Sequence, residues 1–475
     1  MKRNFFKKYL VLNWLMFSVV AFSNAQHSLT LRKGVVIDSL TVPDTNNSFS
    51  IYLPKAFDMQ KSWPILFGFD SSGKASHITH LYKEAAEQNG YIIVASNFSE
   101  ALNDKEKTNY VTSLMNHIFS LLPIQKNRVY VTAIRKDTKL VSLLPVLYNN
   151  DIFGVIAIGD SYYYDSSIKI KSNFSYLGIV NTNSFRYKDF LRNKSYLKRK
   201  NVQADVLAYD GKSELPPPDI FTKALSTFTL HAMGNKRIPV DSTWIQSSFQ
   251  SDLKMVESHL KERKFLEAYN DVKRIRTKYE QFFDTSFLKE KQKEIRRTKG
   301  YKKEKQLYTK YVYRENFFRQ TYLFSLQEDV IAKSYENLDW WQYQVSELDT
   351  LALSKEKYAY EVASRTKGYL KHLVDNYKIA QIPGDKSFEK RMFLNILSTV
   401  VDNKDYESYL EIISLSAVDQ DYETALFYLE KLLQNGYKDF DRLYAIEGTL
   451  ALRMSKEYNI LVEKHLGKAK YFFSK

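Results

Sequence analysis

The spacing of apolar residues changes near residue 240, and this change divides the chain into two regions of different architecture. Before it, short stretches rich in β-branched and aromatic residues alternate with longer stretches of helical periodicity. From about Ser247 onward, apolar residues recur only at helical spacing, as at Leu253, Val256 and Leu260, and no convincing strand follows. Because 475 residues exceed what one hydrophobic core usually holds, two or three domains are expected.

The first region is predicted to span residues 26–240. Its short apolar segments, which we predict as strands, are residues 48–53, 64–69, 91–96, 128–132, 153–158, 176–180 and 205–209. The segments with helical periodicity are residues 80–88, 109–122, 139–148, 187–198 and 219–231. Strands that alternate with helices in this way favour an α/β domain, with a mostly parallel sheet and helices on both faces.

The second region, residues 247–475, is predicted to be all α-helix, with two sub-domains at about 247–380 and 385–475. Two turn-then-helix segments in it share an aromatic residue three positions before an alanine, and these pairs are Phe265 with Ala268 and Tyr422 with Ala425. The pattern resembles the tetratricopeptide-like repeat, in which the alanine lets two helices approach closely. The two copies are not separated by a multiple of the 34-residue repeat, so an ordinary antiparallel helical bundle is the alternative.

The N-terminus has the layout of a secretory signal peptide. A positive start, with Lys2, Arg3, Lys7 and Lys8, precedes an apolar run at 9–22 and small residues at 23–25. The apolar run is shorter than the roughly 20 residues that cross a bilayer, so we expect cleavage of residues 1–25 rather than a membrane-spanning anchor. The chain has no cysteine, which excludes disulfides and lipidation at a cysteine. We therefore expect an exported protein that is not a lipoprotein, in the periplasm first, with the cell surface or secretion as alternatives.

The first region resembles an α/β-hydrolase of the exported esterase kind. The resemblance covers about residues 43–235 and depends on five segments in the order of that family. They are the opening strand at 50–57, the strand and oxyanion-like loop at 64–73, the strand before the nucleophile at 128–132, the next strand at 151–157, and the strand end before the histidine loop at 209–211. The resemblance implies a catalytic Ser-His-Asp triad and a crevice at the carboxyl ends of the strands.

The triad positions implied by the resemblance hold other residues. The nucleophile turn needs the pattern G-x-S-x-G, which occurs nowhere in the chain, and Arg135 stands where its serine belongs. Ser184 stands at the position of the acid, and Ser213 at that of the histidine. A guanidinium stays protonated at ordinary pH and cannot act as a nucleophile. The sequence therefore favours a protein that is not an enzyme, with an active esterase that uses non-standard residues as the alternative.

The crevice implied by the resemblance could still bind a ligand. Arg135 and Lys136 would give it positive charge, and Asp70 and Ser71 lie in the oxyanion-like loop, so a small anion such as a carboxylate, sulfate or phosphate is a candidate. The alternative is that Arg135 pairs with a neighbouring carboxylate such as Asp160 and fills the old site. No cofactor motif or metal-ligand set is recognised.

The helical region offers two candidate binding surfaces. One is a group of aromatic residues that serves either as a partner groove or as the core between helices: Tyr308, Tyr311, Tyr313, Phe317, Phe318, Tyr322, Trp340 and Trp341. The other is residues 289–305, with nine basic and three acidic residues, which could meet an anionic envelope polymer or form a solvated helix face. Despite a net charge of +16, no nucleic-acid-binding motif is present. The leading hypothesis is an exported, inactive esterase-like protein whose helical region binds a protein partner as a scaffold.

Overall fold

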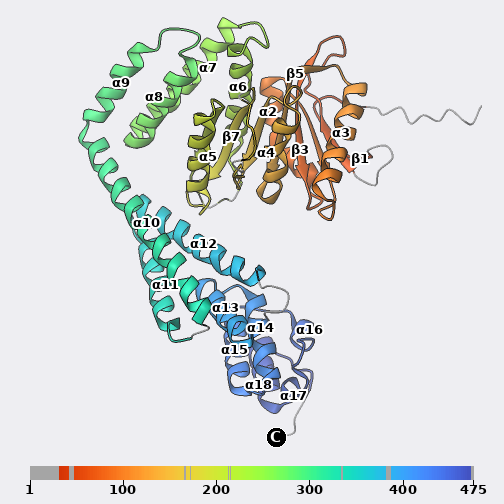
Figure 1. Cartoon of the computed structure of the whole chain (residues 1–475), viewed down its shortest axis with the longest axis vertical. Helices are drawn as coiled ribbons and strands as arrows, with labels where there is room; N and C mark the ends of the chain where they lie inside the picture. The colour runs from red at the N-terminus through yellow and green to blue at the C-terminus, as the bar shows by residue number, and fades with distance from the viewer. Residues whose placement is uncertain are drawn as a thin grey trace, which may run out of the picture. The chain divides into compact units, whose positions relative to one another are not determined.

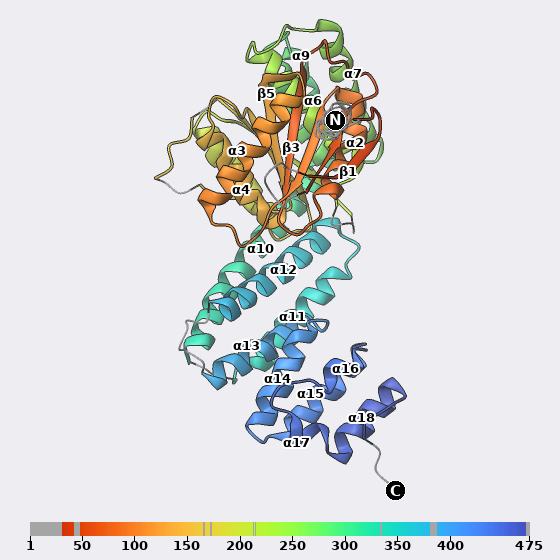
Figure 2. The same cartoon turned by 90° about the vertical axis from the view of Figure 1, so that its right-hand side faces the viewer.

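The computed structural model is shown in two views in Figures 1 and 2. It describes residues 31–41, 48–164, 167–171, 173–211, 213, 215–332, 335–380 and 387–471. The expected signal peptide at residues 1–25 lies outside the described residues. The chain divides into two compact units, Met1–Gln125 and Lys126–Lys475. The domain boundaries expected from the sequence remain predictions.

The eight strands within the described residues have the order β1-β2-β4-β3-β5-β6-β7-β8. Strand β2 is antiparallel to β1 and to β4. The pairs β3–β4, β5–β6, β6–β7 and β7–β8 are parallel. The sheet is mostly parallel, so the predicted fold class of this region is confirmed.

The first unit contributes four strands and two helices. They are β1 (Val36–Thr41), β2 (Ser48–Tyr52), β3 (Trp63–Asp70), α2 (Ala75–Asn89), β4 (Ile92–Asn97) and α3 (Asp104–Leu121). Strand β1 was not among the expected strands, because its six residues are half-buried or exposed and include Asp38 and Ser39, so they lack a strand's apolar pattern. The buried strands β3 and β4 read as continuous apolar runs, which made them easy to recognise.

The second unit contributes the other four strands. They are β5 (Ile124–Ile134, whose first two residues precede the unit), β6 (Gly154–Ile158), β7 (Ser175–Asn181) and β8 (Gln203–Tyr209), with helices α4 (Thr138–Leu147), α5 (Tyr187–Arg199) and α6 (Pro218–Gly234). Successive strand side chains point to opposite faces. The hydroxyl oxygen of Ser175 lies 2.9 Å from Nδ1 of His231 on α6, whereas a Cβ atom on Gly178 would lie 2.3 Å from the Phe190 ring of α5. Helices α5 and α6 therefore cover opposite faces of β7, as predicted.

All described elements after β8 are helical, as the change of rhythm predicts. They are α7 (Ser242–Lys261), α8 (Phe265–Tyr279), α9 (Ser286–Arg297), α10 (Lys299–Ala332), α11 (Leu338–Ala352), α12 (Lys357–Ile379), α13 (Phe388–Val401), α14 (Tyr406–Val418), α15 (Tyr422–Gln434), α16 (Phe440–Leu443), α17 (Leu450–Arg453) and α18 (Lys456–Leu466). Their buried apolar residues form successive clusters, with α10–α13 around Trp341 and α14–α18 around Tyr458. None of the helices among the described residues is both long and apolar enough to cross a membrane.

The two turn-then-helix segments have the same backbone turn. Arg263, before α8, and Gln420, before α15, occupy equivalent positions and have φ angles of 59° and 63°, in the left-handed region. The alanines of the motif, Ala268 and Ala425, are fully buried, as expected for residues at a close helix–helix approach. The aromatics differ, because the Phe265 ring lies against Gly300 whereas the Tyr422 side chain is exposed.

The aromatic group in the helical region contributes to both core and surface. Tyr311, Phe318, Tyr322 and Trp341 are buried in the cluster formed by α10–α13. Tyr313 and Phe317 lie on the same helix α10 but are exposed. The helix therefore has two apolar faces, one packed in the core and one facing solvent.

Candidate functional site

The position of the expected nucleophile is a strained strand-to-helix turn. Strand β5 ends at Ile134, the short 3-10 turn Arg135–Asp137 follows, and α4 begins at Thr138. Arg135 has a φ of 55°, in the left-handed region that residues with a Cβ atom rarely adopt. A turn of this kind exposes the nucleophile in hydrolases of this fold. In this chain, the side chain that it exposes is a guanidinium.

Arg135 is fixed at the backbone and exposed at the side chain. Its carbonyl oxygen accepts a hydrogen bond from the hydroxyl of Thr138 at 2.8 Å. Its Cγ atom lies beside Gly159. A Cβ atom added to Gly159 would be 3.6 Å from this Cγ atom. Lys136 is exposed as well, whereas Asp137 is buried. The exposed face of this turn is therefore cationic.

Ser184, at the expected acid position, holds the start of α5. Its hydroxyl oxygen accepts the N–H of Arg186 at 3.2 Å, and its carbonyl accepts the N–H of Tyr187 at 2.9 Å. Its own N–H donates to the carbonyl of Asn181 at 3.0 Å. A serine with these contacts serves a local turn and carries no charge that could orient a histidine.

Ser213, at the expected histidine position, also serves a local turn. Its hydroxyl donates to the carbonyl of Leu215 at 3.0 Å and accepts the N–H of the same residue at 3.1 Å. The side-chain amide of Asn181, at the end of β7, donates to the carbonyls of Gly211 and Ser213, both at 3.0 Å. The structure thus brings the loops of Ser184 and Ser213 together. The contact between them is made by the side-chain amide of Asn181 and the backbone carbonyls of Gly211 and Ser213.

Helices α10 and α12 hold the loop that follows β7. The guanidinium of Arg365, on α12, donates to the carbonyl of Thr182 at 2.6 Å. That of Arg319, on α10, donates to the carbonyl of Phe185 at 2.8 Å. These two arginines bracket Ser184, so the backbone of the expected acid loop is bound from the helical region.

A buried ionic cluster positions both arginines. Glu315, on α10, has a fully buried side chain, and its carboxylate lies 2.9 Å from Nη2 of Arg365 and 3.1 Å from Nε of Arg319. Lys188, on α5, reaches the same carboxylate at 3.2 Å. Burial lowers the pKa of Lys188 to about 8, although the carboxylate acts in the opposite direction. Glu361 adds a second carboxylate 3.4 Å from Arg365.

A histidine from the helical region lies beside the same loop. His372, on α12, stacks on the Phe185 ring with centroids 4.9 Å apart. Burial lowers its pKa, and the nearby charge of Arg186 adds to this effect. Among the described residues, its ring nitrogen contacts the Asn376 amide at 3.1 Å and no hydroxyl. His372 could not be identified from the sequence, because the helical spacing of its neighbours does not show that it lies beside a loop of the sheet.

Asp160, considered above as a partner of Arg135, forms an ion pair with Arg186. The distance from its Oδ1 to the Arg186 Nε is 3.2 Å. Burial raises the pKa of Asp160, and Arg186 offsets this only in part. Asp160 is therefore tied to the loop that precedes α5.

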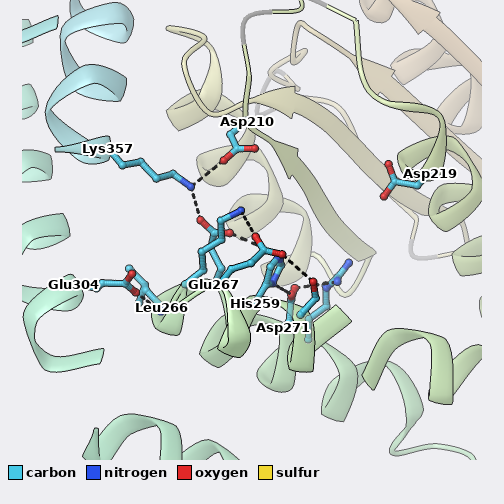
Figure 3. Close-up of polar contacts among 12 residues, drawn as sticks. Asp210, Asp219, His259, Leu266, Glu267, Asp271, Glu304 and Lys357 are labelled. Atoms are coloured by element: carbon cyan, nitrogen blue, oxygen red, sulfur yellow. Dashed lines mark hydrogen bonds and ion pairs between the residues drawn. The ribbon is translucent and has the colours of Figure 1, made fainter. Parts of the chain in front are cut away.

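A second polar cluster joins the end of β8 to the helices, as Figure 3 shows. The ammonium group of Lys357 bonds the carboxylates of Asp210, at 3.1 Å, and of Glu267. Burial alone would lower the pKa of Lys357, but these carboxylates raise it above its usual value. Beside them, Nδ1 of His259 lies 2.8 Å from Asp271. This His–Asp pair was also missed from sequence.

Asp70 and Ser71 lie in the first unit, in the loop between β3 and α2. The carboxylate of Asp70 accepts the N–H groups of Ser72, at 2.9 Å, and of Lys74, at 2.6 Å. It also accepts the Ser72 hydroxyl. These contacts shape the strand-to-helix turn, and Ser71 is half-buried next to them.

The comparisons with known proteins give distant structural likenesses. No protein family model matches the sequence, and no curated relative does. An esterase from Pyrobaculum calidifontis is 11% identical, over 42% of this chain and 86% of its own, with a TM-score of 0.34. An S-formylglutathione hydrolase from Staphylococcus aureus is 10% identical, over 42% and 98%, with a TM-score of 0.33. A feruloyl esterase module from Clostridium thermocellum is 11% identical, over 41% and 85%, with a TM-score of 0.34.

The fold follows from features of the chain itself. The strand order, the reversed β2 and the strained turn at Arg135 are those of an α/β-hydrolase-like region. Twelve helices follow β8 and α6 among the described residues. The chain is therefore an α/β-hydrolase-like fold followed by a helical region.

Proposed function

We propose that this protein is an exported, catalytically inactive α/β-hydrolase-like protein that acts as a scaffold in the cell envelope, in the periplasm, and binds a protein partner through its helical region. The observation that carries the proposal is Arg135. This cation occupies the strained turn where the fold presents its nucleophile, with a φ of 55°.

The other triad positions support inactivity. Acyl transfer needs a nucleophile whose proton a histidine can take, and a carboxylate that orients the histidine. The hydroxyls of Ser184 and Ser213 are both used in local turns. Arg365 and Arg319 bind the backbone on both sides of Ser184 and so oppose its rearrangement around a substrate.

We expect the purified protein to give neither ester hydrolysis nor labelling by a fluorophosphonate probe. The physical reason is that a protonated guanidinium has no lone pair to attack a carbonyl carbon. Hydrolysis of short-chain p-nitrophenyl esters and in-gel fluorescence of the probe measure the two properties. Arg135→Ser is expected to remain inactive as well, because neither a histidine nor an acid occupies the partner positions.

A known serine esterase at equal concentration serves as the positive control for both assays. Labelling of the protein above the level of a heat-denatured sample would contradict the proposal and favour the alternative, an active esterase with non-standard residues. Ser184→Ala and Ser213→Ala would then show whether either hydroxyl carries the label.

The proposed partner surface is an apolar stripe on α10, formed by Tyr313, Phe317, Phe324 and Ile331. Their exposed fractions are 76%, 60%, 62% and 72%. Successive residues of a helix are 100° apart, so spacings of four, seven and seven place all four on one narrow face. Exposed apolar side chains that recur along one face of a helix are candidates for a protein interaction site. The shared left-handed turns before α8 and α15 also support a tetratricopeptide-like design, a class that binds proteins.

Making the apolar stripe polar is expected to abolish capture of the partner. In Phe317→Ser/Phe324→Ser the apolar area that the partner would bury is lost, so the partner band should fall at least about tenfold. Cross-linked pull-downs from envelope extracts with the full mature chain as bait, quantified by mass spectrometry, measure the loss.

Leu353→Ser/Ile379→Ser is the matched control, because both side chains are more than four-fifths exposed and neither is part of the apolar stripe. The control should retain the partner. If both double variants capture the same proteins as the wild type, the apolar stripe is not the binding surface.

A further inference from the structure

The chain turns a corner between α9 and α10. Helix α9 ends at Arg297 and α10 begins at Lys299, so only Thr298, with extended backbone, separates them, as can be followed in Figure 1. The hydroxyl of Thr298 accepts the N–H of Tyr301 at 3.1 Å, and its carbonyl accepts the N–H of Lys302 at 3.2 Å. These bonds cap the first turn of α10, and the Thr298 hydroxyl donates to the carbonyl of Ile295, on α9, at 2.7 Å.

A cavity of about 590 Å³ lies at this corner. Its lining residues are Arg296, Arg297, Tyr301, Lys302, Lys305, Gln306 and Thr309. The last four of these follow the spacing i, i+3, i+4 and i+7, so they share one face of α10. Two arginines from α9 and two lysines from α10, all with exposed side chains, therefore line one open hollow together with the buried Tyr301, and most of the surface of this hollow is formed by carbon atoms.

In the part of the chain that the structure describes, these four cations form no close ion pair, although Arg297 interacts electrostatically with Glu290. Within the described ranges, no carboxylate forms an ion pair with Arg296, Arg297, Lys302 or Lys305; Lys305 does lie over the Tyr308 ring, at 5.1 Å. Two acidic residues of the same basic segment are engaged elsewhere. Glu290 pairs with Lys293 at 2.7 Å. The carboxylate of Glu304 accepts the N–H of Leu266, on α8, at 2.6 Å.

We propose that this cavity binds a phosphate-bearing ligand. Four like charges around one hollow repel each other, and an anion bound among them removes that repulsion and adds charge-assisted hydrogen bonds. The guanidinium fork pairs with two phosphate oxygens at once, and lysine adds a point charge.

The donor set fits phosphate better than a carboxylate. A phosphomonoester carries a charge of about −1.5 to −2 and three acceptor oxygens, whereas a carboxylate carries one charge and two oxygens. The cavity offers four cations together with the Gln306 amide and the Thr309 hydroxyl. The hollow is open to solvent, and its volume of about 590 Å³ gives a diphosphate or a phosphorylated head group room.

The test is isothermal titration calorimetry of the full mature chain with pyrophosphate at low ionic strength. Binding should weaken at least about tenfold in Arg296→Gln/Lys302→Gln, which removes one cation from each side of the corner. The control Lys299→Gln/Lys303→Gln removes the same charge from the same basic segment, but neither residue lines the cavity. Its affinity should stay within about twofold of the wild type, and circular dichroism should show both variants folded.

The source of the phosphate is distinguished by co-sedimentation with phosphatidylcholine vesicles with and without phosphatidic acid. Vesicle binding that pyrophosphate displaces, and that only the cavity variant loses, assigns the site to a lipid head group. Pyrophosphate binding without vesicle binding assigns it to a soluble phosphorylated ligand. The proposal is overturned if neither probe binds, if the control variant loses as much as the cavity variant, or if polyglutamate of equal charge competes as well as pyrophosphate.

Discussion

Replacing Glu315 by alanine is expected to lower the free energy of unfolding of the second unit by about 3–5 kcal/mol. Its carboxylate is fully buried and pairs with Arg365, Arg319 and Lys188. Without it, three cations remain in a low-dielectric site, where Glu361 lies 3.4 Å from Arg365 and Asp189 interacts electrostatically with Arg319. Urea denaturation followed by circular dichroism at 222 nm measures the loss, and hydrogen exchange of residues 182–185 should become faster because Arg365 and Arg319 are no longer positioned.

Glu347→Ala is the matched control for this change. Glu347 also pairs with an arginine of α10, Arg314, but the distance is 3.8 Å and both side chains are about 40% exposed. Exposed pairs contribute about 0–1 kcal/mol, so the control should unfold almost as the wild type does. A Glu315→Ala variant that is no less stable than Glu347→Ala would show that the buried cluster does not hold the helices to the loop after β7.

Trp341→Ala is expected to cost about 3–5 kcal/mol, since it empties the centre of the core formed by α10–α13. The Trp341 side chain is fully buried and its ring lies 5.6 Å from that of Tyr322. Its indole N–H donates to the buried carboxylate of Asp329 at 2.7 Å. The alanine variant therefore leaves both a cavity and a carboxylate without one of its donors, and thermal unfolding should show a midpoint lower by about 6–20 °C.

Two further variants separate these effects. Trp341→Phe keeps most of the buried ring but removes the donor to Asp329, so it should cost only about 1–3 kcal/mol. Tyr343→Ala, two residues along the same helix and 58% exposed, should fall within about 0.5 kcal/mol of the wild type. Equal losses for Trp341→Ala and Tyr343→Ala would contradict the assignment of Trp341 to the core.

The strands were predictable where burial is complete. Seven of the eight strands, all but β1, could be placed from the sequence. Four of these, β3, β4, β6 and β7, are apolar almost throughout and bounded by turns. Strand β1 escaped, because an edge strand with polar side chains has no apolar pattern to recognise. The change to helix alone near residue 240 was equally clear, because periodicity is a local property.

The site was predictable only in its local part. The segment around Arg135 identifies a strand-to-helix turn, since strand β5 and helix α4 both have strong patterns. What covers the loop of Ser184 was not predictable, because Arg319 and Arg365 come from helices far along the chain. The two faces of α10 could have been found, since Tyr311, Phe318 and Tyr322 share a helical spacing that excludes Tyr313 and Phe317.

The bond between Arg365 and Thr182 constrains the order in which the chain can acquire its structure. The two residues are separated by 183 positions, so the carbonyl of Thr182 receives this bond only after α12 has been synthesised. Contacts of such long sequence separation form slowly, because a large loop must close first. During synthesis, the loop after β7 is therefore made long before Arg365, which binds the carbonyl of Thr182. A chain truncated before α12 would lack the bond from Arg365 to the carbonyl of Thr182.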